Sequence, residues 1–158
     1  MSTQPRKALL ASGNYWTSPM QAGSHHIARG LAARGWEVAY ISDPISPWHL
    51  LGGVDLGQRV KLYRQDGVRD CAGRVWAYVP GALAVPANRP LLRSGWVHRW
   101  WQRLSIPNVV RLVRRQGFGK VDLLLMDSFS QPFWLEALQA GCSVFRVADQ
   151  LSHYPKAT

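Results

Sequence analysis

The first 42 residues constrain the fold most, because a strand pattern, a helix pattern and a second strand pattern follow one another there. The apolar run Lys7–Ser12 predicts the first strand. A helix is predicted over His25–Arg34, with Ser24 as its N-cap and Gly35 as its stop. Trp36–Ser42 alternates and is rich in Val, Ile and Tyr, which predicts the second strand. A βαβ unit of this kind is right-handed in nearly every case and joins parallel strands.

The C-terminal half returns to the same alternation of strand and helix. Lys120–Asp127 is a continuous apolar run, typical of a parallel strand covered on both faces. A helix is predicted over Gln131–Ala140, with Gly141 at its end, and a last strand over Ser143–Ala148. We therefore expect residues 1–158 to form a single Rossmann-like α/β domain with a doubly wound, mostly parallel sheet, and ligands at the carboxyl ends of its strands.

The middle of the chain has a less regular pattern. Prolines and glycines across Asp43–Gly57 and Gly81–Pro90 predict loops. Between and after these loops the pattern predicts three short strands and two helices: Val60–Tyr63, Val68–Arg69 and Arg74–Val79, then Leu91–Leu104 and Pro107–Gln116.

Composition limits the possible partners. Nineteen Lys and Arg against nine Asp and Glu give a net charge of +10, which attracts nucleic acid, anionic lipid or phosphorylated substrates. The two cysteines have no metal-ligand spacing and no Asp-x-Asp motif occurs, so we expect neither a metal nor a cofactor. No apolar run is long enough to span a bilayer. We expect a cytoplasmic protein, or one peripheral to the inner face of the cytoplasmic membrane.

The loop after the first strand is a candidate binding element. It fits neither the GxGxxG fingerprint nor a Walker loop. It is longer than the roughly two to six residues usual in α/β units, which favours a role in a cleft. The helix start at Ser24 and His25 would offer free N–H groups to an anionic or hydroxyl-rich ligand. The alternative is a capped helix with two surface histidines.

Polar residues at two predicted strand ends could line the same cleft. Asp149 directly follows the last strand, where a carboxylate can act as general base toward a sugar hydroxyl. The alternative is an aspartate that caps a turn or pairs with Arg146. Asp127 and Ser128 stand at the end of the preceding strand and would shape the cleft.

The predicted helix Leu91–Leu104 combines tryptophan with arginine, as membrane-interface helices do. The alternative is a helix packed in the core with a solvated basic face. If the first reading holds, the residues at the membrane interface are Trp96, Arg99, Trp100, Trp101 and Arg103.

The sequence also resembles a known family. A first strand, a loop with Ser18-Pro19 and a helix ending at Arg34-Gly35 resemble the start of GT-B glycosyltransferases. With the segment Phe145–Ser152, they are similar to the membrane-associated glucuronosyltransferase family of xanthan biosynthesis. The resemblance spans nearly the whole chain and implies the N-terminal, acceptor-side half of a two-domain enzyme. The C-terminal nucleotide-sugar domain would then be absent from this chain, and the chain alone would be inactive.

The resemblance implies transfer of a sugar from a nucleotide-sugar donor to a lipid-linked or polysaccharide acceptor. It further implies inversion, with Asp149 as the base. In that family the N-terminal domain binds a polyprenyl-diphosphate-linked oligosaccharide and carries a basic, aromatic surface that faces the membrane. The residues expected to bind the acceptor are Tyr15, Ser18, Met20, Gly23, Ser24, His25, Asp127, Ser128 and Arg146.

A different class of function fits the charge alone. The chain could be a non-catalytic, basic Rossmann-like module that binds nucleic acid or an acidic partner. Its basic residues are not interleaved with aromatic residues on the predicted strands, as they are in common RNA-binding modules. We therefore expect no nucleic-acid partner.

Overall fold

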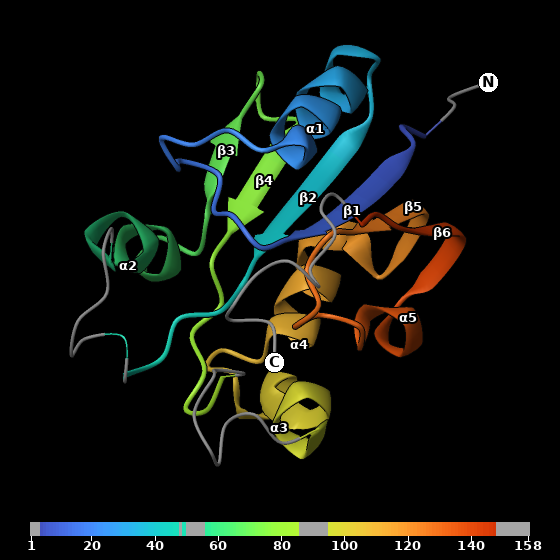
Figure 1. Cartoon of the computed structure of the whole chain (residues 1–158). Helices are drawn as coiled ribbons and strands as arrows, with labels where there is room; N and C mark the ends of the chain where they lie inside the picture. The colour runs from blue at the N-terminus through green and yellow to red at the C-terminus, as the bar shows by residue number, and fades with distance from the viewer. Residues whose placement is uncertain (1–3, 48, 50–55, 86–94, 148–158) are drawn as a thin grey trace.

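The computed structural model describes residues 4–47, 49, 56–85 and 95–147, and within them the strands form one six-stranded sheet (Figure 1). The strand order is β3-β4-β2-β1-β5-β6, and all neighbours in it pair parallel except β3 and β4. This arrangement confirms the predicted Rossmann-like, mostly parallel α/β fold. The strands are β1 (Lys7–Ser12), β2 (Glu37–Ser42), β3 (Val68–Asp70), β4 (Val75–Tyr78), β5 (Lys120–Met126) and β6 (Gln139–Phe145).

Helices cover both faces of the sheet, with α1 on one side and α4 on the other (Figure 1). The segment between α4 and β5 is a π-helical turn, η3, and a 3₁₀ turn, η2, follows α3. The helical elements are α1 (Gly23–Ala33), α2 (Leu56–Arg64), α3 (Gly95–Trp100), η2 (Trp101–Leu104), α4 (Val109–Val113), η3 (Arg114–Phe118) and α5 (Trp134–Ala137).

Strand β1 lies at the centre and is buried on both faces. Side chains alternate between the faces of a strand, so Leu9 and Ala11 enter the core on the α4 side while Ala8 and Leu10 enter the core on the α1 side. All four are 0% exposed. This double burial explains why the sequence reads as an unbroken apolar run.

The predicted first helix forms, but it begins earlier than expected. Its N-cap is Ala22, so the prediction of Ser24 as the cap is wrong. The ring Nδ1 of His25, the third residue of the helix, accepts the Ala22 N–H at 3.1 Å, which is the bond that the N3 side chain makes in a capping box. Gly35 has φ +86°, which confirms it as the residue that ends the helix.

The predicted strand Val60–Tyr63 is wrong, because these residues belong to helix α2. Leu62 is buried, and Leu56, Val60 and Tyr63 pack around the same small core. Their spacing of four and three residues is helical. The loop predicted across Asp43–Gly57 therefore ends where α2 begins.

The predicted helix Gln131–Ala140 is also wrong in extent. Only Trp134–Ala137 is α-helical, and β6 already begins at Gln139, four residues before the predicted strand. Lys120 pairs with Gln139 and Met126 with Phe145, so β6 runs the length of β5. Ladder hydrogen bonds with β5 override the strong intrinsic helical preference of the first two residues, Gln139 and Ala140.

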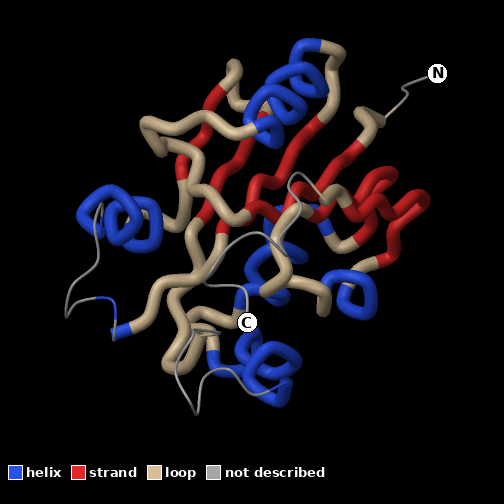
Figure 2. Tube along the Cα trace, in the orientation of Figure 1, coloured by secondary structure: helices blue, strands red, loops and turns tan. Residues whose placement is uncertain are grey.

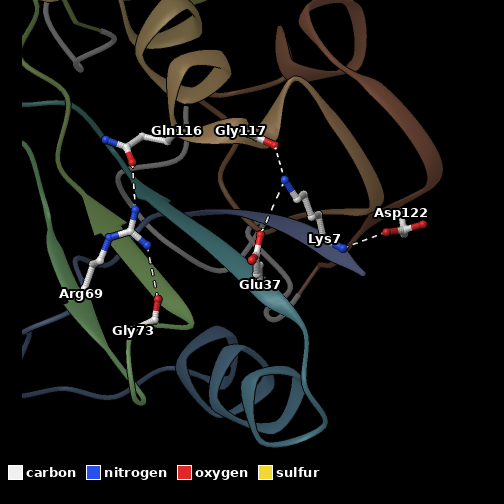
Figure 3. A network of polar contacts seen from close by, with 7 residues as sticks. All are labelled: Lys7, Glu37, Arg69, Gly73, Gln116, Gly117 and Asp122. Carbon is white, nitrogen blue, oxygen red and sulfur yellow. Dashed lines mark hydrogen bonds and ion pairs between the residues drawn. The ribbon is translucent and has the colours of Figure 1, made fainter. Parts of the chain in front are cut away.

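The amino-terminal ends of the strands are held together by a polar network (Figure 3). The backbone N–H of Lys7 donates to Asp122 Oδ2 at 2.7 Å, and its Nζ donates to Gly117 O at 2.8 Å. Lys7 Nζ also lies 3.6 Å from Glu37 Oε2. Because these groups are partly exposed, the ion pair contributes at most about 1 kcal/mol.

The double burial of β1 predicts a large cost for truncating it. Leu9→Ala should lower the free energy of unfolding by about 2–5 kcal/mol, because the substitution leaves a cavity in the core. The measurement is urea unfolding followed by circular dichroism. Leu135→Ala is the matched control, since Leu135 is 54% exposed on α5. Equal losses in the two variants would contradict the described core.

Candidate functional site

The carboxyl ends of β1, β2 and β5 meet at one edge of the sheet, where the chain leaves the strands as loops (Figure 2). β2 lies on one side of β1 and β5 on the other. The connections that leave β1 and β4 therefore lead to opposite sides of β1, which makes this edge a topological switch point. Crevices at such switch points bind ligands in open α/β sheets. Gly13 follows β1, Asp43 follows β2 and Asp127 follows β5.

Asp43 is the centre of a polar cluster in this crevice. Its Oδ1 accepts hydrogen bonds from the Ser128 hydroxyl, from the Ser130 hydroxyl at 2.6 Å and from Gln131 Nε2 at 3.1 Å. Its Oδ2 accepts none from the described residues. Among the described residues, three groups donate to one carboxylate oxygen and none donates to the other.

Gln131 ties this cluster to the sheet. It is 0% exposed, and its Nε2 also lies 3.3 Å from Ile41 O and 3.5 Å from Ser12 O. Its Oε1 accepts the indole N–H of Trp134 at 2.9 Å. A buried amide whose donor and acceptor are both used fixes the strand ends relative to the loop after β5.

Arg59 brings a positive charge from α2 to the cluster. Its Nη2 donates to Asp43 O at 2.8 Å and to Pro44 O at 3.4 Å. Its Nε is buried and has no hydrogen-bond partner in the described part of the chain. Burial lowers the pKa of Arg59 and the nearby Asp43 carboxylate raises it, while the guanidinium remains protonated at neutral pH.

A cavity of about 170 Å³ opens beside these groups. Pockets for drug-sized ligands take roughly 300–1,000 Å³, so this one suits a smaller ligand or one part of a larger ligand. Its lining residues are Gly13, Asp43, Pro44, His49, Arg59, Val85 and Ser130.

Ser24 and His25, two of the predicted acceptor residues, lie inside the protein. Each is 0% exposed, and the Ser24 hydroxyl bonds those of Ser12 and Tyr40. Burial raises the pKa of Tyr40 to about 12, so its hydroxyl keeps its proton at neutral pH. The His25 backbone N–H donates to Ala22 O at 3.0 Å, so the expectation of a free N–H at His25 is wrong.

The same burial orients the His25 ring. Nδ1 accepts the Ala22 N–H, so the ring hydrogen sits on Nε2, which donates to Tyr15 O at 3.0 Å. Tyr15 and Ser18 are each only 8% exposed. The first half of the long loop is thus held by internal contacts, and His25 is not the surface histidine of the alternative reading.

Gly23 and Arg146, both predicted acceptor residues, are brought together. A methyl group on Gly23 would lie 2.5 Å from both Nη atoms of Arg146, so the guanidinium packs directly on the first residue of α1. The first turn of α1 has no acidic residue. This positive corner combines a helix N-terminus with a guanidinium. Met20, nearby in the loop, is 73% exposed.

The predicted strand-end residues are also placed in the crevice. Asp127 Oδ1 accepts the Gly13 N–H at 3.3 Å, and Ser128 belongs to the Asp43 cluster. Asp149 lies outside the described residues.

The tryptophan-rich segment divides into buried and exposed parts. Trp101 is 1% exposed and donates its indole N–H to Ser130 O at 2.6 Å, so its predicted place at a membrane interface is wrong. Trp96 is 62% exposed, and the Arg103 guanidinium lies 3.7 Å from the centroid of the Trp100 ring. The side chain of Arg99 lies outside the described residues.

No helix among the described residues has the length and apolar character to cross a bilayer. They also contain no group of three or more His, Cys, Asp or Glu side chains able to hold a metal ion.

Sequence reasoning missed Asp43, Arg59 and Gln131. Asp43 had a usable signal, because it follows the strand β2 directly, as Asp127 follows β5. Arg59 was hidden by the wrong strand assignment over α2. Gln131 gave no signal, because its partners Ser12, Ile41 and Asp43 are about 90 to 120 residues away in the sequence.

The fold is a Rossmann-like domain of the kind from which GT-B glycosyltransferases are built. A family model described as "Glucuronosyltransferase GumK, N-terminal domain" matches residues 10–157. The chain therefore belongs to this glycosyltransferase family, in agreement with the resemblance in its sequence. A comparison with curated proteins found no significant match.

The contacts of Gln131 predict a pH-dependent loss of stability. Gln131→Glu should lower the free energy of unfolding at pH 7 by roughly 2–5 kcal/mol, because a second carboxylate would face Asp43 in a buried site. Repulsion raises the pKa of the introduced carboxyl in the folded state. The loss should therefore shrink as pH falls and that group takes up a proton.

Chemical unfolding at pH 7 and pH 4.5 tests this expectation. Gln65→Glu is the control, since Gln65 is exposed at the end of α2. A stability loss of the same size at both pH values would show that charge repulsion is not its cause.

Proposed function

We propose that this chain is the acceptor-binding half of a glycosyltransferase that moves a sugar from a nucleotide-sugar donor to a lipid-linked or polysaccharide acceptor. The observation that carries the proposal is the family match over residues 10–157, on a domain whose crevice at the switch point carries polar side chains. The donor would bind to a second, C-terminal domain, and the active site would form between the two.

In the proposed reaction the acceptor hydroxyl attacks the anomeric carbon in line, and the nucleoside diphosphate leaves with inversion. Asp149 takes the hydroxyl proton as general base, an effect of about 10²–10⁴-fold. Its place in the chain supports this role. Arg146 donates its backbone N–H to Met126 O at the end of β5. Arg146 therefore lies beside Asp127, and Asp149 follows three residues later in the sequence.

The surface around the crevice suits an acceptor with a polar head and an apolar tail. A second cavity, of about 320 Å³ and mostly apolar, lies between α2 and the segments after β2 and β4. The positive corner at Gly23 and Arg146 suits a diphosphate. The apolar lining of the second cavity includes Ile45, Leu56, Val60, Tyr63, Leu83 and Ile106.

The general-base role predicts a large effect from an isosteric substitution. In the two-domain protein, Asp149→Asn should lower transfer from nucleotide sugars to membrane-extracted lipid acceptors by about a hundredfold or more. The matched control is Asp66→Asn, because Asp66 is exposed in a turn at φ +51°, a conformation that Asn tolerates. Full activity in Asp149→Asn would move the base to another residue, and no transfer with any donor would contradict the function itself.

We also propose that Trp96, Trp100 and Arg103 contact an anionic membrane surface. Trp96→Ala should weaken binding to vesicles containing phosphatidylglycerol by roughly tenfold, because the exposed indole would otherwise bury apolar area there. Sedimentation with vesicles at low and high salt measures this, with Leu135→Ala as the control. Absence of vesicle binding, together with nucleic-acid binding that weakens steeply with salt, would instead favour the basic binding module.

A further inference from the structure

The cavity beside Asp43 and Arg59 has no part in the transfer step described above. We propose that it is a subsite for the hydroxyl groups of one sugar ring of the acceptor, with Asp43 accepting from a hydroxyl and Arg59 donating to one. This inference rests on the proposed function, whose acceptor is a saccharide.

The hydrogen bonding of Asp43 is asymmetric in a way that suits a ligand. Ser128, Ser130 and Gln131 all donate to Oδ1, which holds the carboxylate in one orientation. Oδ2 accepts from none of the described residues, and Asp43 lines the cavity. A carboxylate oxygen is a strong acceptor for a hydroxyl hydrogen, and here its position is fixed before a ligand arrives.

Arg59 supplies the complementary donor. Two backbone carbonyls hold Nη2, so the guanidinium is positioned on the cavity wall. Nε is fully buried, so a ligand hydroxyl in the cavity would accept from an Nη group instead.

The charges select for a neutral ligand. The Asp43 carboxylate and the Arg59 guanidinium cancel in net charge, and the other polar residues of the lining, Gly13, Ser130 and His49, add no charge when the His49 ring is neutral. A phosphate would gain from Arg59 but would be repelled by Asp43. A hydroxyl can donate to the carboxylate and accept from the guanidinium, so a pair of neighbouring hydroxyls uses both groups.

The size of the cavity sets a second limit. At about 170 Å³ it has room for one sugar ring or part of one, and not for an oligosaccharide. The Gly13 N–H donates to Asp127 in the same crevice, so a ring bound here lies at the switch point. The subsite would thus position one residue of the acceptor near the edge where transfer is proposed.

Gly13 offers a variant that blocks the subsite without changing its charges. A methyl group there would lie 3.8 Å from Asp43 Oδ2, which is an ordinary van der Waals contact. Gly13 is not among the glycines with positive φ, so alanine fits its backbone. Gly57→Ala is the matched control, because a methyl group on that residue meets nothing within 4 Å.

The experiment is an NMR titration of the ¹⁵N-labelled chain with methyl β-glucopyranoside, methyl α-mannopyranoside and, separately, inorganic phosphate. We expect at least one glycoside to shift the backbone amide signals of Gly13, Asp43 and Ser130, and phosphate to leave them in place. Gly13→Ala should raise the glycoside Kd roughly tenfold or more, as expected for loss of a hydrogen bond to a charged group. Gly57→Ala should bind as the wild type does.

Three results would overturn the subsite: no shift with either glycoside, shifts with phosphate alone, or unchanged glycoside binding in Gly13→Ala. The transfer assay separates this proposal from the proposed function. If the wild type transfers sugar and Gly13→Ala keeps the KM for the acceptor, the subsite is wrong and the function stands. If Gly13→Ala abolishes glycoside binding but the wild type transfers no sugar, the subsite stands and the function fails.

Discussion

The rest of the structure depends on the pairing of β1 with β2 on one edge and β5 on the other. Both edges of β1 are hydrogen-bonded and both of its faces are buried. Its position therefore fixes the direction and the register of β2 and β5. Three parallel strands in fixed register end at the same edge. That is why Gly13, Asp43 and Asp127 meet, although up to 114 residues separate them.

The second organising contact is the buried amide of Gln131. It joins the ends of β1 and β2 to the loop after β5, and through Asp43 it also fixes the serine hydroxyls. These contacts both stabilise the loop and orient the carboxylate. Arg59 reaches the same place from α2, so the crevice has a negative and a positive group whose positions come from different elements.

Local sequence patterns were sufficient to predict a strand where its burial in the structure agrees with its apolar pattern. β1 and β2 were predicted to within one residue at each end, and β5 was predicted apart from Asp127. The pattern failed at α2, where Val60 and Tyr63 suggested a strand although Leu56, Val60 and Tyr63 have helical spacing. It failed again at Gln139, where the long-range ladder with β5 outweighs local preference. Within the candidate site, their position at the end of a strand identified Asp127 and Ser128. The prediction of Ser24 as the helix N-cap was wrong, because its hydroxyl is buried and hydrogen-bonded to Tyr40.

The sequence by itself determined the alternation of strand and helix, the parallel sheet and the edge at which the carboxyl ends of its strands meet. These properties follow from apolar periodicity and from the handedness of βαβ units, which are local. Only the tertiary structure decided which side chains occupy that edge and which are buried. Asp43 accepts hydrogen bonds from residues 85 to 88 positions away in the sequence. Trp101 is buried and donates its indole N–H to Ser130 O. Such contacts depend on the packing of distant segments, which no window of the sequence contains.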